Sequence, residues 1–136
     1  MVTSIYQSEN IDIIIDMAKI LVIDDDINTT WLIDNVFSKE GYEIHTVNTS
    51  VTALSEALII QPDLILLDLM MPEIDGLATI RELNKLLPEI KIIITSGLAN
   101  EESIRQAFAI GASAFLPKPS LPVEILRIVN SLIGKS

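Results

Sequence analysis

Two apolar segments of the sequence end in aspartate. The run Ile20–Ile23 leads into three consecutive aspartates at positions 24–26, and the run Leu64–Leu67 leads into Asp68. Apolar runs without polar alternation are typical of strands that are buried on both faces of a parallel sheet. In open α/β sheets, ligand sites lie at the carboxyl ends of the strands. These aspartates are therefore the first candidates for chemistry.

The carboxylates of Asp24, Asp25 and Asp68 would lie close together if the strands that precede them are neighbours. Crowded carboxylates repel one another and bind protons more tightly unless a cation lies among them. A cluster of oxygen ligands without histidine or cysteine suits Mg²⁺ or Mn²⁺. Alternatively, the aspartates at 24–26 only cap the following helix, where acidic residues are favourable. The triplet by itself leaves both interpretations open.

Two further polar side chains follow predicted strands. Ile92–Ile94 leads into Thr95, and Phe115–Pro117 leads into Lys118. A hydroxyl, an ammonium and carboxylates at one edge of a sheet form a pocket suited to a phosphoryl group. Singly, threonine is common in strands and lysine is common on surfaces. Their occurrence at successive strand ends favours the functional interpretation.

The remaining pattern predicts the elements that would position these residues. Short apolar runs alternate with segments of helical periodicity, and three of these segments stop at glycine or proline. The alternation predicts an α/β fold with a five-stranded parallel sheet in the order 2-1-3-4-5, flanked by five helices in a flavodoxin-like, doubly wound arrangement. The predicted strands are 19–24, 43–47, 63–68, 91–95 and 113–116, and the predicted helices are 28–40, 50–60, 76–87, 100–110 and 122–133.

Composition bounds the class of protein. The 136 residues, 49% of them hydrophobic, suit one well-packed domain. The net charge of −10 opposes nucleic-acid binding, and the absence of cysteine excludes disulfides and thiolate metal sites. No apolar run approaches the roughly 20 residues that span a bilayer, and the first residues lack the positive stretch of a secretion signal. We therefore expect a cytoplasmic protein without nucleic-acid or membrane partners.

Over about residues 18–133 the chain resembles the receiver domain of two-component response regulators. The resemblance rests on the motifs Lys19–Asp25, Asp68–Gly76, Thr95–Ser96 and Gly111–Pro119. It implies a signalling module that takes a phosphoryl group from a sensor histidine kinase or phosphotransfer protein and then acts on a downstream protein, with a phosphorylation-dependent homodimer as a further expectation. Because little chain follows these motifs, output through protein contact rather than through a DNA-binding domain is expected.

Residues 1–16 match no element that the later pattern requires. They are interpreted as an N-terminal extension, either an extra strand or helix at the margin of the sheet or residues from upstream of the true start. Residues 17–136 are interpreted as the receiver domain.

The resemblance also implies a role for each site residue. Asp68 would be the phospho-acceptor, and Asp25 and Asp68 would bind Mg²⁺ directly, whereas Asp24 would hold the metal mainly through water. The backbone carbonyl of Met70 would complete the protein ligands. Lys118 would pair first with the acceptor carboxylate and then with the phosphoryl group.

A switch is implied as well. Thr95 would hydrogen-bond the phosphoryl group, and Phe115 would turn inward behind it, changing the surface formed by the fourth helix, fifth strand and fifth helix. Plain core packing is the alternative role for Phe115. The Lys118–Pro119 peptide bond is expected to be cis.

The sequence departs from the common family pattern at several positions. Phe115 stands where tyrosine is frequent, Ser120 stands where an aromatic residue is usual after Lys118–Pro119, and Leu121 occupies the expected cap of the last helix. Met70 and Gly97 flank the site without an acid or amide to orient water. We therefore expect slow self-hydrolysis of the phosphoaspartate. The resemblance implies a signalling module rather than an enzyme, with self-phosphorylation and slow self-dephosphorylation as its only activities.

Two other functions fit parts of the sequence. Asp24 and Asp26 also fit the aspartate-x-aspartate signature of haloacid-dehalogenase-like Mg²⁺ phosphatases, with Asp24 as nucleophile and Asp26 as general acid, but that hypothesis leaves the Asp68–Gly76 segment unexplained. A receiver-like interaction module that is never phosphorylated is the other alternative, and the intact set of site residues argues against it.

Several residues are expected to have structural roles only. His45 is expected to be an exposed strand residue, and Trp31 a half-buried helix residue. Thr49 or Ser50 is expected to cap the second helix, and Asp75 to form the turn that opens the third helix.

Overall fold

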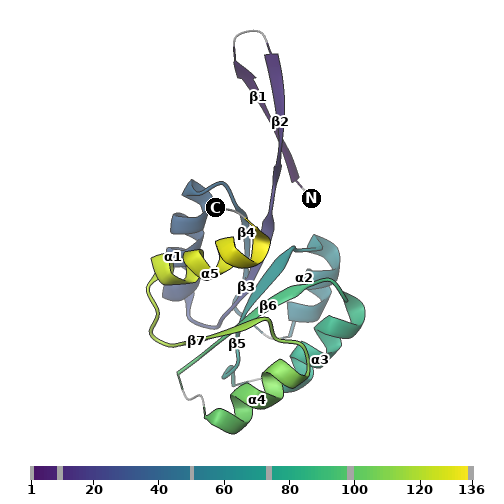
Figure 1. The fold of residues 1–136 in the computed structure, drawn as a ribbon, viewed down its shortest axis with the longest axis vertical. Helices are drawn as coiled ribbons and strands as arrows, with labels where there is room; N and C mark the ends of the chain where they lie inside the picture. The colour runs from purple at the N-terminus through teal and green to yellow at the C-terminus, as the bar shows by residue number, and fades with distance from the viewer. Residues whose placement is uncertain (1, 9–10, 50, 73–74, 98–99, 135–136) are drawn as a thin grey trace.

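The computed structural model describes residues 2–8, 11–49, 51–72, 75–97 and 100–134, with the backbone alone for residues up to 16. Its strands are β1 (Val2–Ser8), β2 (Ile11–Met17), β3 (Lys19–Ile23), β4 (Glu43–Val47), β5 (Leu64–Asp68), β6 (Lys91–Ser96) and β7 (Ala114–Pro117). Its helices are α1 (Ile27–Lys39), α2 (Ala53–Ile60), α3 (Gly76–Leu86), α4 (Glu101–Ala109) and α5 (Pro122–Ile133). Figure 1 shows how they are arranged.

Strands β3 to β7 form one parallel sheet in the order β4-β3-β5-β6-β7. Counted from β3, this is the predicted order 2-1-3-4-5, and the prediction of five parallel strands with five helices is confirmed. The predicted bounds of each element differ from the observed ones by at most three residues. Among the residues that the structure describes, no helix is long and apolar enough to cross a membrane.

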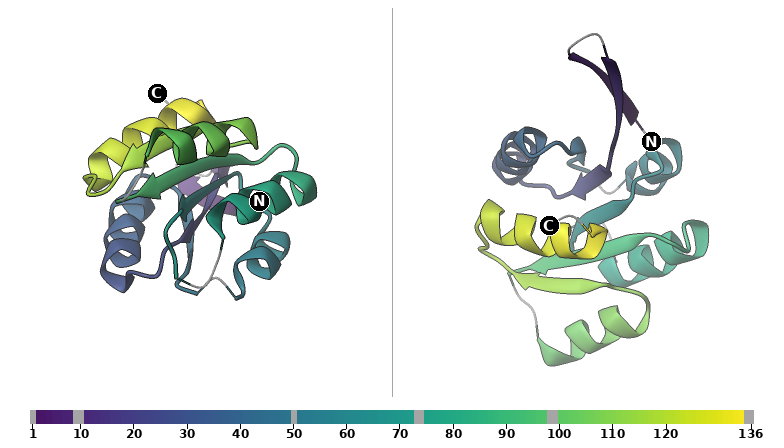
Figure 2. Two further views of the ribbon diagram at one scale, coloured as in Figure 1. Left: turned by 90° about the horizontal axis from the view of Figure 1, so that it is seen from below. Right: turned by 45° about the horizontal axis from the view of Figure 1, so that its top comes forward.

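Alternate residues of the strands supply two apolar cores, because successive side chains of a strand point to opposite faces. In β5, Ile65 and Leu67 join a core cluster that includes residues of α2, α3 and α4. Leu64 and Leu66 join a second cluster that includes residues of α1 and α5. The helices thus cover both faces of the sheet, and Figure 2 shows these layers from two further directions. The four apolar residues of β5 are buried for this reason.

Helix ends follow the local sequence. Gly41 and Gly111 adopt positive φ angles of 89° and 123° just after α1 and α4, a conformation that glycine adopts without strain. Asp75 caps α3 by accepting hydrogen bonds from the backbone N–H groups of Leu77 and Ala78, and Pro122 begins α5.

The expected start of α2 is wrong. Thr49 Oγ1 accepts a hydrogen bond from Val51 N at 3.3 Å, so this hydroxyl closes a turn ahead of the helix, and Thr52 is the residue at the N-cap. Ser50, the other expected cap, lies outside the described residues.

The expectation that Trp31 is half-buried is also wrong, since 63% of its surface is exposed. The buried residues of α1 are Thr30, Ile33 and Phe37, whose spacing of three and four residues defines the face toward the sheet. Trp31 lies off that face.

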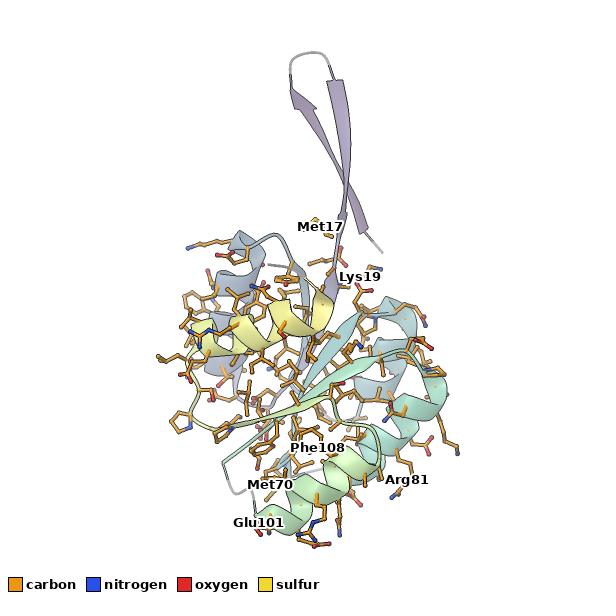
Figure 3. All side chains as sticks on the ribbon, in the orientation of Figure 1. Met17, Lys19, Met70, Arg81, Glu101 and Phe108 are labelled. Carbon is orange, nitrogen blue, oxygen red and sulfur yellow. The ribbon has the colours of Figure 1, made fainter. Side chains whose placement is uncertain are left out.

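Strands β1 and β2 form a separate antiparallel hairpin, in which Val2 is paired with Met17 and Ser8 with Ile11. The hairpin adds no strand to the five-stranded sheet, and Figures 1 and 2 show it projecting away from the body of the molecule. It leaves the body at the amino end of β3. Met17 and Lys19 therefore lie at the end opposite to Met70, as Figure 3 shows.

Candidate functional site

The carboxyl edge of the sheet brings the predicted site residues together. Asp24 directly follows β3, Asp68 ends β5, Thr95 lies near the end of β6 and Lys118 directly follows β7. Carboxylate oxygens of Asp24, Asp25 and Asp68 all lie within 4.8 Å of one another. The predicted crowding of the carboxylates at this edge is thus present in the structure.

Lys118 connects two of these carboxylates. Its Nζ donates hydrogen bonds to Asp24 Oδ2 at 2.7 Å and to Asp68 Oδ2 at 3.1 Å. The backbone N–H of Lys118 donates to Ser96 O at 2.9 Å, which attaches this residue to the neighbouring strand. The Lys118–Pro119 peptide bond is cis, as predicted.

Asp68 is fixed from its own loop and from the adjacent strand. It is only 6% exposed, and its Oδ1 accepts a hydrogen bond from the backbone N–H of Met70 at 3.0 Å. Thr95, 4% exposed, lies opposite Asp68 in the register of β5 and β6. Leu69 N donates to Thr95 O at 2.9 Å and extends this pairing by one residue. A hydroxyl and a carboxylate therefore lie side by side at the edge of the sheet.

The aspartate triplet divides its roles, which answers the question that the sequence left open. Asp26 caps α1, since its carboxylate accepts hydrogen bonds from Asn28 N at 2.9 Å and Thr29 Oγ1 at 3.0 Å. Asp24 is 3% exposed, and its Oδ1 accepts a hydrogen bond from Asp26 N at 2.9 Å. Helix capping thus accounts for Asp26, whereas Asp24 and Asp25 belong to the cluster.

Burial and hydrogen bonding shift the pKa values of Asp24 and Lys118 in opposite directions. Burial raises the pKa of Asp24 above its usual value, and the hydrogen bond from Lys118 offsets this only in part. Burial also disfavours the charged form of Lys118, but its hydrogen bonds to Asp24 and Asp68 outweigh that effect and raise its pKa. One ammonium therefore stays protonated among several carboxylates that it does not fully neutralise.

The pKa of Asp26 is lowered, in contrast to that of Asp24. Its hydrogen bonds from Thr29 Oγ1 and the backbone N–H of Asn28 lower its pKa. A general acid must instead keep its proton near neutral pH, which requires a raised pKa. This geometry disfavours the phosphatase hypothesis, in which Asp24 is the nucleophile and Asp26 the general acid.

The donor set fits a hard divalent cation. The three clustered carboxylates supply oxygen ligands without histidine or cysteine, as Mg²⁺ prefers, and Asp25 is exposed, so the cluster is open to solvent. A cation there would remove the mutual repulsion of the carboxylates. Met70 is 53% exposed beside Asp68, in the loop that follows β5.

Sequence reasoning missed Asn48. Its Nδ2 donates hydrogen bonds to Asp24 O at 2.8 Å and to Thr30 Oγ1 at 3.1 Å, and so ties the end of β3 to α1. The signal was present, because Asn48 directly follows β4 just as Asp24 follows β3. A search for polar residues at the ends of all strands, rather than for charged residues alone, would have identified Asn48.

The other predicted residues lie away from the carboxylate cluster. Phe115 is half-buried and packs against the core on the face covered by α2, α3 and α4. It lies opposite Ile94 in the register of β6 and β7. His45 is partly exposed on β4, with its Nε2 2.7 Å from Glu43 Oε2.

Comparisons with known proteins point to one family. The family model of the response regulator receiver domain matches residues 20–130. The chain is similar to the chemotaxis protein CheY of Thermotoga maritima, with 28% identity over 115 residues that cover 84% of this chain and 96% of that protein. The crystal structure of a CheY-like receiver domain protein from Methanospirillum hungatei superimposes with a TM-score of 0.84 at 26% identity and covers 88% of this chain and 95% of that one.

Longer proteins also match. The transcriptional regulatory protein CpxR homolog of Haemophilus influenzae is 29% identical over 120 residues, which cover 88% of this chain and 52% of that protein. The chain thus spans about half the length of this relative. Since the family model matches most of the sequence, and the fold agrees with that of a solved receiver domain, the chain belongs to the family of response regulator receiver domains.

Proposed function

We propose that Asp68 accepts a phosphoryl group from a sensor histidine kinase or a phosphotransfer protein, and that the phosphoaspartate is the signal. The observation that carries the proposal is the position of Lys118 Nζ, 2.7 Å from Asp24 Oδ2 and 3.1 Å from Asp68 Oδ2. A lysine held against a buried carboxylate beside a hydroxyl is suited to receive the charge of a phosphoryl group.

In the proposed transfer, a carboxylate oxygen of Asp68 attacks phosphorus in line. The bond between phosphorus and the donor's imidazole nitrogen breaks and its electron pair stays on that nitrogen. Because the other ring nitrogen of the phosphorylated imidazole carries a proton, the imidazole leaves as the neutral base. Lys118 pairs with the oxygens of the transferred group, and the Thr95 hydroxyl donates a hydrogen bond to one of them. The domain positions and neutralises the reacting groups, as is typical of phosphoryl transfer.

Asp24, Asp25, Asp68 and the backbone carbonyl of Met70 would hold Mg²⁺. When bound, Mg²⁺ offsets the negative charge of the transferring oxygens. The support for this assignment is the set of carboxylate oxygens within 4.8 Å of one another. Asp24 contributes mainly by orienting water and by pairing with Lys118.

The readout is proposed to be a change of the surface formed by α4, β7 and α5. Phosphorylation adds roughly −1.5 to −2 charge units at neutral pH, enough to attract the Thr95 hydroxyl and bias a two-state loop. Phe115 would then move behind Thr95, and a downstream protein or a second copy of the chain would bind the altered surface. Residues 17–136 would form this receiver domain in the cytoplasm, with residues 1–16 as an extension.

The test is incubation with Mg²⁺ and acetyl phosphate, followed by intact mass measurement. The wild type is expected to gain the mass of one phosphoryl group, and Asp68→Asn is expected to gain none. Asp34→Asn is the matched control, because Asp34 is an exposed aspartate of α1 and should leave labelling intact. Equal labelling of wild type and Asp68→Asn would refute the assignment.

Slow loss of the phosphoryl group is proposed as well, since Met70 and Gly97 supply no acid or amide to orient water. The phosphorylated protein, freed of donor and kept in Mg²⁺, should retain its label for minutes or longer. A lifetime of seconds would contradict this expectation.

A further inference from the structure

A cavity of about 430 Å³ opens beside the Asp24–Lys118 pair, between α1 and the start of α5. Its apolar part is lined by Leu32 and Ile33 of α1, Leu66 of β5 and Ile125 of α5. Three of these four side chains are buried, whereas Leu32 lies half-exposed at the surface. The cavity therefore leads from the molecular surface to an apolar interior wall.

The small side chain at position 120 contributes to this space. Ser120 lines the cavity, and its hydroxyl donates a hydrogen bond to the carbonyl of Pro117. A large side chain at this position would occupy part of the volume. The cavity therefore depends in part on the small side chain at position 120.

The cavity is larger than a metal ion or a phosphoryl group requires. At about 30 Å³ per water in the liquid, its volume equals roughly fourteen waters. It falls within the range of about 300–1,000 Å³ that is typical of small-molecule sites, which combine apolar walls with a few polar groups. A small organic molecule is thus an occupant of suitable size.

The charge of the polar end selects among such molecules. Lys118 is already paired with Asp24 and Asp68, so its charge is largely compensated. Asp26 lines the cavity as an exposed carboxylate. It accepts hydrogen bonds from Asn28 N and Thr29 Oγ1, and a carboxylate has room for further donors. An ammonium group is therefore favoured beside Asp26, and an anion is disfavoured there when no Mg²⁺ is bound.

We propose that this cavity binds a small amphipathic amine, with its apolar body between α1, β5 and α5 and its ammonium at Asp26. Binding requires neither Mg²⁺ nor phosphorylation of Asp68. Because the amine lies against Lys118 and Thr95 as well, an occupied cavity would place a ligand beside the groups proposed to receive the phosphoryl oxygens.

The test uses three probes of similar shape: 2-phenylethylamine, 2-phenylethanol and phenylacetate. Each is titrated into the full ¹⁵N-labelled chain without Mg²⁺ or phosphodonor. The amine should cause saturable shifts of the Leu32, Ser120 and Ile125 amides, the alcohol should bind more weakly, and phenylacetate should bind at least tenfold more weakly than the amine.

Substitutions at Ser120 and at Asp26 test the effects of cavity size and of charge separately. Ser120→Phe should abolish saturable binding, whereas Ser120→Ala should retain it because the cavity stays open. Asp26→Asn should weaken binding of the amine several-fold but leave the alcohol unchanged, since asparagine can still cap α1. Backbone spectra and melting temperatures show whether each variant folds, and Leu32→Trp is a second filling variant if Ser120→Phe does not.

Three outcomes would overturn the proposal: no saturable shifts with the amine, equal binding to the folded filling variants, or phenylacetate binding as tightly as the amine. Slower phosphotransfer from a donor protein to Ser120→Phe, without probe binding to the wild type, would also overturn it and would assign the cavity to a donor side chain. Failure of Asp68 to label with acetyl phosphate would leave the binding result intact, so the two proposals are tested separately.

Discussion

Asp24 is buried beside a second carboxylate, and this position costs stability. Burial raises its pKa, and the Asp68 charge acts in the same sense, whereas Lys118 and the N–H of Asp26 favour the charged form without fully compensating. A group whose pKa is raised in the folded state destabilises the fold at pH values above that pKa. The carboxylate cluster thus lowers the stability of the metal-free fold, a common trade-off at functional sites, and the cation proposed to bind there would relieve the repulsion.

We therefore predict that Asp24→Asn stabilises the metal-free protein at pH 7 by about 1 kcal/mol, a typical magnitude for one substitution. The gain should shrink as pH falls through the raised pKa of the folded state and vanish below 3.8, the usual pKa of the group, where the wild-type carboxyl binds a proton in both states. Urea unfolding at several pH values measures it. Asp34→Asn on the surface of α1 should change little, and a destabilised Asp24→Asn would contradict the argument.

Lys118 has the opposite effect on stability. Although burial disfavours its charged form, the hydrogen bonds to Asp24 and Asp68 raise its pKa above 10.5. The stabilising contribution of Lys118 is therefore complete below pH 10.5 and is lost as pH rises through its raised pKa. Removing it leaves two buried carboxylates without their shared partner.

Lys118→Met should accordingly destabilise the metal-free protein at pH 7 by about 2 kcal/mol, somewhat less than for a fully buried pair because the lysine is partly exposed. The difference from wild type should diminish above pH 10.5. Denaturant unfolding across this range measures it. Lys85→Met is the matched control, because Lys85 lies on the surface 3.9 Å from Glu82 and should be nearly neutral. If the stability difference between Lys118→Met and the wild type instead grows above pH 10.5, the stabilising role assigned to the charged Lys118 is wrong.

Among the elements, the connection from β5 to α3 depends on a close approach at Gly76. A Cβ atom at this position would lie 2.7 Å from the carbonyl oxygen of Leu69 and 2.6 Å from its Cδ1. Leu69 follows the proposed phospho-acceptor directly. The first residue of α3 thus packs against the backbone beside Asp68.

Gly76→Ala is expected to shift this connection, to lower stability by roughly 1–3 kcal/mol as overpacked sites do, and to slow labelling of Asp68 by acetyl phosphate. Gly97→Ala provides the comparison near the same edge, because the closest atom to its Cβ would be Lys118 Cβ at 3.9 Å. Thermal unfolding and the labelling rate measure both effects. A fully stable Gly76→Ala that labels at the wild-type rate would show that the loop adapts without cost.

Most elements could be predicted because their signals are local. The apolar runs of β3, β5 and β6 have no polar alternation, and glycine or proline follows several helices. The start of α2 could not be placed correctly because Thr49 bonds to the backbone two residues ahead, a competing use of a hydroxyl that also suits a helix cap. The exposure of Trp31 could not be predicted because it depends on which face of α1 the sheet covers.

The positions of the site residues at one edge of the sheet could be predicted, but which of the three aspartates at 24–26 caps α1 could not. Strand-end positions placed Asp24, Asp68, Thr95 and Lys118 at one edge, and the parallel order then brought them together. Which aspartate caps α1 depends on backbone angles, and the cavity beside Ser120 depends on the separation of α1 and α5. Both are properties of packing between elements that are distant in sequence.

At the scale of the whole molecule, the β1–β2 hairpin stands apart from the domain. Its strands pair with each other and with no strand of the five-stranded sheet, and the hairpin projects from the end opposite to Met70 (Figures 1 and 3). A two-stranded hairpin is marginally stable by itself in water. Ala18, the single residue between β2 and β3, accepts a hydrogen bond from Glu43 N and so belongs to the sheet.

We therefore expect a chain that begins at Met17 to fold and to be phosphorylated like the full chain. Among the side chains that the structure describes, the core residues of both apolar clusters lie in the retained part, as do the residues of the proposed site. The melting temperature should change by no more than a few degrees, and labelling of Asp68 by acetyl phosphate should proceed at the same rate. A matched variant that begins at Lys19 removes Ala18 and should be less stable, because Glu43 N loses its acceptor. If the chain from Met17 fails to fold, the hairpin must contribute contacts to the domain, and the boundary proposed at residue 17 is wrong.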